Sequence, residues 1–159
     1  METKVFAEDL DSAGVNGEER MLDDSTQPVS LFVYGTLMPG QGNHRRIECF
    51  VHRARPGRIH GVLVDLGAFP ALIPGEGLVK GILLDIDLSA LGITDQIEGY
   101  APNRSDCLYI RKQIIVTLDD ETRVKAWTYE FAAPQRILDH PRMPMQIIDD
   151  VVAYAWPMR

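Results

Sequence analysis

The sequence predicts an α+β fold, with few short helices set on a mostly antiparallel sheet or small barrel. Three observations lead to this class. Apolar runs typical of strands outnumber helical patterns, two of these runs are joined by a short polar link, and strands do not alternate regularly with helices. With 159 residues, the chain is long enough to bury the core of one domain.

Charge divides the chain into two parts. Residues 1–28 hold eight acidic and two basic side chains, a net charge of −6, whereas residues 29–159 hold fifteen acidic and fourteen basic ones, a net charge of −1. The acidic leader is also poor in aromatic residues, which predicts a flexible or loosely docked tail; a partner-binding arm is the alternative. Residues 29–159 are expected to form a single domain.

The composition excludes several classes of protein. The apolar and charged fractions, 45% and 25%, are those of an ordinary globular protein, and no apolar run approaches the roughly 18 residues of a membrane helix. The N-terminus lacks the apolar core of a signal peptide. Cys49 and Cys107 are too sparse for a disulfide framework and fit a reducing cytoplasm. The near-neutral body argues against a nucleic-acid groove, although residues 44–58 are locally basic.

Five strands are expected, at Ser30–Tyr34, Gly57–Val64, Leu78–Ile86, Tyr109–Leu118 and Arg123–Phe131. The first is a continuous apolar run, which indicates burial on both faces. The second and third are separated by GAFPALIPGEG, whose proline and glycine residues predict turns. The last two are joined by residues 119–122, a polar link that predicts a hairpin.

Two helices are expected. Asn43 can cap a helix from His44 to about His52, and Ser89 can cap a second helix that ends at Gly99. The segment from Leu138 to the C-terminus receives no assignment.

Glu98 has a special place in the second helix, because it is the last residue before Gly99. A carboxylate at a helix C-terminus faces the negative end of the helix dipole, and partial burial would disfavour its charge further. Its pKa is then expected to rise towards neutrality, where one carboxyl can both accept and donate a proton. The alternative is an ordinary solvated glutamate at the end of a helix.

The predicted hairpin places polar and aromatic groups together. By the period of two in a strand, Tyr109, Arg111 and Gln113 share one face, as do Trp127, Tyr129 and Phe131 of the partner strand. Such a face can be the rim of the core or the polar lining of a pocket. The abrupt turn in SLFVYGTLMPG, residues 30–40, also has two interpretations. It can be a simple turn, or it can be a cradle for a charged ligand.

Four segments in order resemble the γ-glutamylcyclotransferase-like family: YGTL after the first strand, then FPALIPGEGLVKGILLDI, DQIEGY, and YIRK leading a hairpin that ends in WTYEF. The resemblance runs from about Leu31 to Phe131. It implies a small mixed barrel flanked by short helices, and an activity that releases 5-oxoproline from a γ-glutamyl amine or peptide. The family often has Leu-Asp before the catalytic glutamate segment, where this chain has Thr94-Asp95.

The resemblance also assigns roles to residues. The family's YGxL loop, which binds the γ-glutamyl group through its backbone, corresponds here to Tyr34, Gly35, Thr36 and Leu37. Successive N–H groups in such a loop form a concavity that favours an anion. Glu98 matches the family's acid/base glutamate.

Further pocket residues follow from the same resemblance. Tyr109 and Tyr129 match pocket tyrosines, and Arg111 is a further candidate for substrate binding, or for pairing with a nearby acid. No cofactor is expected, and the partner is a small-molecule γ-glutamyl substrate, without nucleic acid or membrane.

Two alternatives stand beside this hypothesis. His44, His52 and His60 recur every eight residues, but without the close His or Cys pairs typical of metal sites, so no metal is expected. The same fold can also serve as a non-catalytic ligand-binding or interaction module, because folds host many functions. The oligomeric state is not predicted.

Overall fold

A computed structural model describes residues 28–148 and 151–157 of the chain. Its strands are β1 (Pro28–Val33), β2 (Val51–Asp65), β3 (Pro70–Asp87), β4 (Tyr109–Leu118), β5 (Arg123–Phe131), β6 (Met145–Ile148) and β7 (Val151–Tyr154). The helix α2 spans Ala90–Glu98, and short 3₁₀ turns occur at His44–Arg46, Glu48–Phe50 and Pro134–Arg136. The acidic leader lies outside the described residues except for Pro28.

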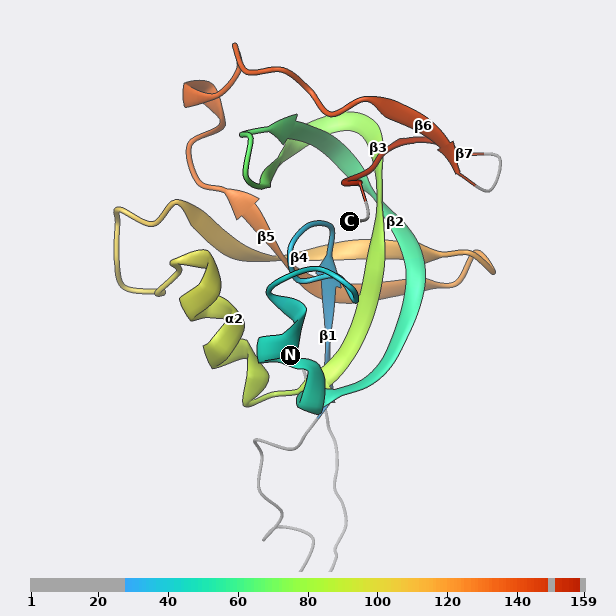
Figure 1. The fold of residues 1–159 in the computed structure, drawn as a ribbon, viewed down its shortest axis with the longest axis vertical. Helices are drawn as coiled ribbons and strands as arrows, with labels where there is room; N and C mark the ends of the chain where they lie inside the picture. The colour runs from blue at the N-terminus through green and yellow to red at the C-terminus, as the bar shows by residue number, and fades with distance from the viewer. Residues whose placement is uncertain (1–27, 149–150, 158–159) are drawn as a thin grey trace, which may run out of the picture.

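Five strands close into a barrel (Figure 1). The order β1-β5-β4-β2-β3 returns to β1, because β1 also pairs with β3 over its full length. The β1–β5 pair is parallel, at Leu31 and Trp127, whereas the other barrel pairs are antiparallel. The predicted class, a small mixed and mostly antiparallel barrel with short helices, is confirmed.

The five expected strands are all present, and the first three have longer or shifted bounds. The hairpin of β4 and β5 is confirmed at the predicted bounds, with Tyr109 opposite Phe131 and Arg111 opposite Tyr129. In β1, Leu31, Phe32 and Val33 are buried in succession, as the continuous apolar run predicts. Their side chains contribute to a core whose largest fully buried members include Phe32, Leu31, Ile47, Ile59, Leu63, Leu72, Leu83, Leu84 and Ile86.

The prediction of a helix from His44 to about His52 is wrong. Residues 44–50 form two short 3₁₀ turns, and β2 already begins at Val51. Val51 pairs with Ile86 in the β2–β3 ladder, so the chain enters the sheet before a stable helix length is reached. Asn43 does not cap a helix through its side chain.

The prediction of turns across residues 67–77, between the second and third strands, is wrong in part. The reversal is confined to residues 66–69, where the Leu66 N–H bonds the Phe69 carbonyl at 3.1 Å. Strand β3 then starts at Pro70, and Ala71 already pairs with Val64 of β2. Residues 74–77 lie between the two paired stretches of β3 and form its irregular part. Pro70 and Pro74 thus stand at the two ends of the paired residues 70–73 and do not interrupt the pairing.

The second predicted helix is confirmed as α2, which lies on one side of the barrel in Figure 1. Gly99 adopts the left-handed conformation with φ of 70°. Its N–H bonds the Gln96 carbonyl, and the Tyr100 N–H bonds the Asp95 carbonyl, which together form a Schellman motif. Ser89 precedes the helix, but its side chain makes no capping hydrogen bond.

The unassigned C-terminal segment forms the β6–β7 hairpin, at the top of the view in Figure 1. Strand β7 joins the sheet beside β3, through Val79 and Tyr154. Within the described ranges, no helix has the length and apolar character needed to cross a membrane.

Candidate active site

The YGTL segment forms a tight loop directly after β1. The Met38 N–H bonds the Gly35 carbonyl at 3.0 Å, and the Asn43 N–H bonds the Thr36 carbonyl at 3.0 Å. Both contacts use carbonyl oxygens of the loop. Because N–H and C=O point in opposite directions across a trans peptide, the N–H groups of Thr36 and Leu37 point away from these internal bonds. The loop can therefore offer them to a ligand.

Two side chains brace this loop. Asn43 donates from Nδ2 to Thr36 Oγ1 at 2.9 Å, and His44 Nδ1 lies 2.8 Å from the Leu37 carbonyl oxygen. Gly35 packs so closely on Pro70 that an added Cβ would lie 2.8 Å from Cγ of that ring. Only glycine fits at this position without a shift of the loop or the proline.

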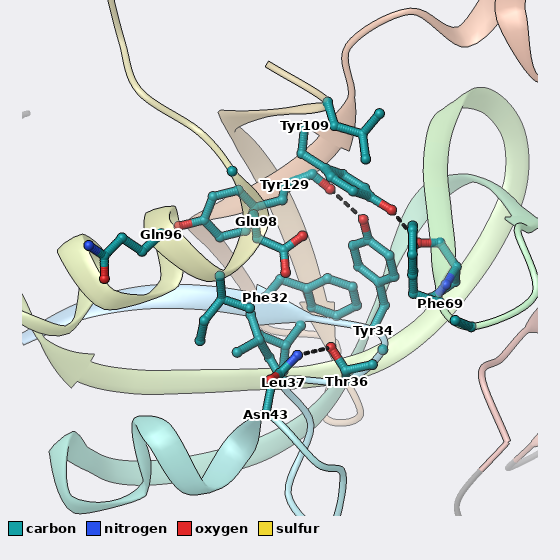
Figure 2. Close-up of a pocket in the computed structure, with 17 residues that line it drawn as sticks. Phe32, Tyr34, Thr36, Leu37, Asn43, Phe69, Gln96, Glu98, Tyr109 and Tyr129 are labelled. Atoms are coloured by element: carbon teal, nitrogen blue, oxygen red, sulfur yellow. Dashed lines mark hydrogen bonds between the residues drawn. The ribbon is translucent and has the colours of Figure 1, made fainter. Parts of the chain in front are cut away.

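The loop forms one wall of a cavity of about 510 Å³, which Figure 2 shows. Seventeen residues line the cavity: Phe32, Val33, Tyr34, Gly35, Thr36, Leu37, Asn43, Ala68, Phe69, Pro70, Gln96, Ile97, Glu98, Gly99, Leu108, Tyr109 and Tyr129. They come from β1 and its loop, the β2–β3 turn, the end of α2 and the β4–β5 hairpin. All but one of the residues predicted to form the site are in this set.

Glu98 provides the one charged side chain among these lining residues. It is the last residue of α2, and the Schellman motif turns the chain away immediately after it. In Figure 2 its carboxyl group points into the cavity. Burial raises the pKa of Glu98 from its ordinary value of 4.5 to about 7. A carboxyl with this pKa exchanges a proton readily at neutral pH.

The three cavity tyrosines are fixed by hydrogen bonds to the protein. Tyr34 donates to the carbonyl of Tyr129 at 2.6 Å, and Tyr109 donates to the carbonyl of Pro70 at 2.8 Å. Tyr129 donates to Asp95 Oδ1 at 2.5 Å. Since a hydroxyl has a single hydrogen, each of these groups can offer only lone pairs to a ligand.

The same tyrosines stay neutral at physiological pH. Burial raises the pKa of Tyr34 well above its ordinary value, and nearby Tyr109 and Glu98 raise it further. Burial likewise raises the pKa of Tyr109, with Glu98 adding to the effect. For Tyr129, burial and the hydrogen bond to Asp95 act in the same direction. Glu98 is therefore the cavity group suited to exchange protons near neutral pH.

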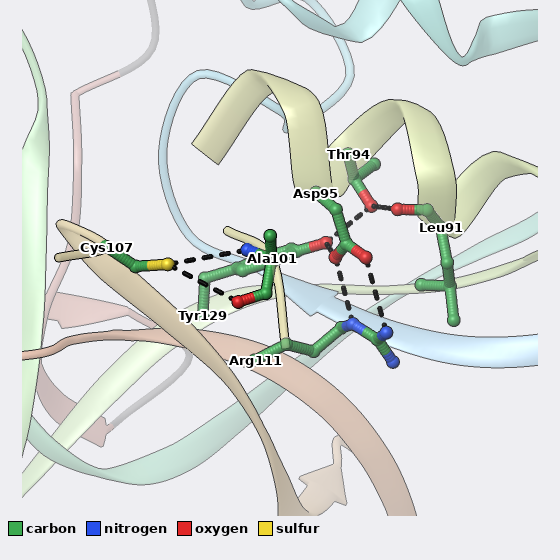
Figure 3. Close-up of polar contacts among 7 residues, drawn as sticks. All are labelled: Leu91, Thr94, Asp95, Ala101, Cys107, Arg111 and Tyr129. Atoms are coloured by element: carbon green, nitrogen blue, oxygen red, sulfur yellow. Dashed lines mark hydrogen bonds and ion pairs between the residues drawn. The ribbon is translucent and has the colours of Figure 1, made fainter. Parts of the chain in front are cut away.

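Arg111 lies apart from the cavity wall. Its guanidinium bonds Asp95 through Nε, at 2.9 Å from Oδ1, and through a terminal nitrogen, at 3.3 Å from Oδ2 (Figure 3). It shares a strand face with Tyr109, as predicted, but pairs with an acid from α2 and does not line the cavity.

The three histidines of the eight-residue pattern have different surroundings. His44 contacts the loop after β1, His52 pairs with Asp87 at 2.5 Å, and His60 is exposed. Over residues 28–148 and 151–157, no three His, Cys, Asp or Glu side chains come together as metal ligands.

Sequence reasoning missed several lining residues. Asn43 was expected to cap a helix, yet it braces Thr36 and lines the cavity. The sequence predicts that Phe69 and Pro70 belong to a turn region, whereas in the structure Pro70 accepts the hydrogen bond from Tyr109 and packs on Gly35. The sequence predicts a turn within residues 30–40, but not which side chain contacts the loop after it.

Fold and site together define a small barrel with a cavity, which the Glu98 carboxyl and the loop after β1 both line. Residues 31–146 match the family described as gamma-glutamyl cyclotransferase, AIG2-like, and the chain belongs to this family.

Individual relatives agree with this assignment. The gamma-L-glutamyl-butirosin B gamma-glutamyl cyclotransferase of Niallia circulans is 33% identical over 104 residues, which are 64% of this chain and 66% of that protein. A second relative, from Vibrio cholerae, is 35% identical over 72 residues, 43% of this chain and 60% of that protein. The chain thus spans less than two thirds of the length of each.

A crystal structure of an AIG2-like protein from Mus musculus is similar in fold. Its TM-score is 0.58 at 27% identity, over 73% of this chain and 86% of the mouse protein. A solution structure from Arabidopsis thaliana gives a TM-score of 0.57 at 22% identity, over 70% of this chain and 67% of that one, and supports the fold alone.

Proposed function

We propose that the protein is an enzyme that cyclises a γ-glutamyl amine or peptide, releasing 5-oxoproline and a free amine, with Glu98 as the general acid/base. One observation carries this proposal. The Glu98 carboxyl, with its pKa near 7, lines the same cavity as the Gly35–Leu37 loop. A proton carrier and a cradle for an anion thus face one space that is large enough for a small molecule.

The reaction needs one proton carrier and no enzyme nucleophile. The Glu98 carboxylate takes a proton from the substrate's α-ammonium, and the freed amine attacks the γ-carbonyl carbon of the same molecule. A carbon–nitrogen bond forms and closes a five-membered ring. The protonated Glu98 then gives its proton to the departing nitrogen as the original γ-amide bond breaks. The regenerated Glu98 carboxylate takes the second proton from the ring nitrogen, which becomes the lactam N–H, and passes it to the released amine. The nucleophile is tethered to its target, so a folded pose has a high effective concentration.

The loop after β1 supplies the complementary charge interaction. The N–H groups of Gly35 to Leu37 are proposed to bind the substrate's α-carboxylate or the oxygen that becomes negative at the γ-carbonyl. Tyr34, Tyr109 and Tyr129 complete the substrate-binding walls. Because the hydroxyl hydrogens of Tyr34 and Tyr109 are committed to protein acceptors, their oxygens suit the N–H groups of an ammonium or an amide. Tyr129 contributes its ring, since its hydroxyl already contacts Asp95 and Thr94.

The name of the Niallia circulans relative includes a γ-L-glutamyl substrate, which supports the γ-glutamyl group as the part recognised here. The proposed steps transfer only protons and an acyl group, so they call for no redox cofactor. We place the reaction in the cytoplasm, since Cys49 and Cys107 are free and a reducing compartment keeps thiols in this state.

The test is a panel of γ-glutamyl amines and γ-glutamyl dipeptides incubated with the full chain. Both 5-oxoproline and glutamate are quantified by liquid chromatography and mass spectrometry. Release of 5-oxoproline in equal amount to the free amine supports cyclisation. Release of glutamate would indicate hydrolysis, and binding without any product would favour a non-catalytic module on the same fold.

A further inference from the structure

Asp95 connects the end of α2 to the β4–β5 hairpin. It lies three residues before Glu98, so the two side chains are neighbours on the helix surface. Arg111 of β4 grips the Asp95 carboxylate with two hydrogen bonds, at 2.9 and 3.3 Å. The side chains of Arg111 and Asp95 are only 18% and 16% exposed, so the pair is held in fixed geometry and is poorly screened by water.

The faces of the Arg111 guanidinium are also occupied. Its central carbon lies 4.6 Å from the centre of the Trp127 ring and 5.6 Å from that of Tyr100. Trp127 belongs to β5, and Tyr100 is folded back by the Schellman motif that ends α2. Arg111 therefore joins the helix end to both strands of the hairpin, and its carboxylate-binding edge is already used by Asp95.

The pair reaches the cavity through Tyr129. Asp95 Oδ1 accepts the hydrogen bond of the Tyr129 hydroxyl, and the ring of that tyrosine lines the cavity. The backbone carbonyl of Tyr129 in turn accepts from the Tyr34 hydroxyl. Asp95 and Arg111 thus hold one cavity tyrosine directly and a second one indirectly, while contacting neither the cavity nor its loop.

Thr94 orients this arrangement further. Its hydroxyl lies 2.7 Å from the Tyr129 hydroxyl and 3.1 Å from the Leu91 carbonyl (Figure 3). The two hydroxyls have two hydrogens for three contacts, including that of Tyr129 with Asp95. Tyr129 donates its hydrogen to Asp95, so the single Thr94 hydrogen is left for the Leu91 carbonyl or the Tyr129 oxygen. Buried Thr94 is thus a second contact, beside Asp95, that holds the Tyr129 hydroxyl in place.

We propose that the Asp95–Arg111 pair is a positioning device that locks the last turn of α2 to Tyr129 and thereby aims the Glu98 carboxyl at the substrate. Arg111 acts through Asp95 and does not bind the substrate itself. This inference rests on the proposed function. A misplacement of about 1 Å at a reacting group can cost about a hundredfold in rate, so a loosened helix end should lower turnover more than binding.

The test compares Arg111→Gln and Asp95→Asn with wild type, using a γ-glutamyl amine that wild type cyclises. We expect kcat to fall about ten- to a hundredfold in each variant, while KM and the Kd of 5-oxoproline change less than about threefold. The kcat of the double variant should fall no further than that of the more severely affected single variant, because both changes break the same connection.

Lys112→Gln is the matched control. Lys112 follows Arg111 in β4 and pairs across the hairpin with Glu130 at 3.1 Å, away from the cavity lining. It should keep kcat within about twofold. Should Arg111→Gln fail to fold, Arg111→Lys keeps the charge but loses the two-pronged bond and the stacking, and it is expected to fall between wild type and Arg111→Gln in kcat.

The outcomes separate the possibilities. A large loss of 5-oxoproline affinity or a large rise in KM with kcat retained would show that Arg111 binds the substrate, and would overturn the positioning role. Unchanged kcat in folded Arg111→Gln would overturn it as well. Wild type that releases no 5-oxoproline with any substrate of the panel would instead overturn the proposed function, and the positioning role with it.

Discussion

Removing the charge of Glu98 should stabilise the protein at alkaline pH. Burial raises the pKa of Glu98 from 4.5 to about 7, so the folded state disfavours the ionised carboxyl. At about 1.4 kcal/mol for each pKa unit, this difference amounts to about 3 kcal/mol between the unfolded and folded states. Glu98→Gln keeps the size of the side chain and cannot ionise.

The pH dependence follows from proton binding in the two states. Below pH 4.5 the carboxyl is protonated both folded and unfolded, and its contribution to stability is fully present. Between pH 4.5 and about 7 only the folded state keeps the proton, so that contribution falls as the pH rises, and above pH 7 it is lost. The free energy of unfolding of Glu98→Gln should match wild type near pH 4.5 and exceed it by about 3 kcal/mol at pH 8.

Urea unfolding followed by circular dichroism at several pH values from 4.5 to 8.5 measures this difference. Glu76→Gln is the control, because Glu76 is exposed and does not line the cavity, and its difference from wild type should show no such trend. A Glu98→Gln variant that is less stable than wild type at pH 8, or a difference that does not change with pH, would refute the burial argument.

Three further predictions concern the loop, the leader and the leaving group. Gly35→Ala should weaken 5-oxoproline binding at least about tenfold in calorimetry, since the added Cβ would meet the Pro70 ring. Gly42→Ala is the control and should bind as wild type does, because its Cβ would have nothing within 4 Å. Equal affinities in the two variants would contradict the close packing at Gly35. Deleting residues 1–24 should change the Tm by less than about 2 °C, and a larger fall would indicate a docked leader. γ-Glutamyl amines without a carboxylate in the leaving group should have a kcat/KM about tenfold higher than that of γ-glutamyl amino acids. The reason is that Glu98, an acid, is the one charged residue among those described as lining the cavity. A higher kcat/KM for the γ-glutamyl amino acids would count against this electrostatic argument.

Local signals explain which elements could be predicted from the sequence. Alternation along residues 109–131 defined the hairpin, and Gly99 marked the end of α2, because a left-handed C-terminal residue is a property of the local chain. Glu98 could be placed at that helix end for the same reason. The size of the Glu98 pKa shift could not be predicted from the sequence, since it depends on burial by residues distant in sequence.

Long-range contacts explain the failures. The helix expected after Asn43 is replaced by 3₁₀ turns because Val51 is held by Ile86, a strand pairing that no local pattern reveals. Arg111 shares the predicted face with Tyr109, but its partner Asp95 comes from another element. The period of two fixes which side of a strand a residue occupies, and tertiary packing decides what it meets there.

The most direct measurement is 5-oxoproline release by wild type and Glu98→Gln, assayed side by side at pH 7 with the preferred γ-glutamyl substrate. Circular dichroism and calorimetry first establish that the variant folds and binds 5-oxoproline. Loss of the acid/base group should then lower kcat by about 10²–10⁴-fold, with Glu98→Asp intermediate because its shorter arm misplaces the carboxyl. A folded, ligand-binding Glu98→Gln that releases 5-oxoproline at the wild-type rate would contradict the role of Glu98 as proton carrier.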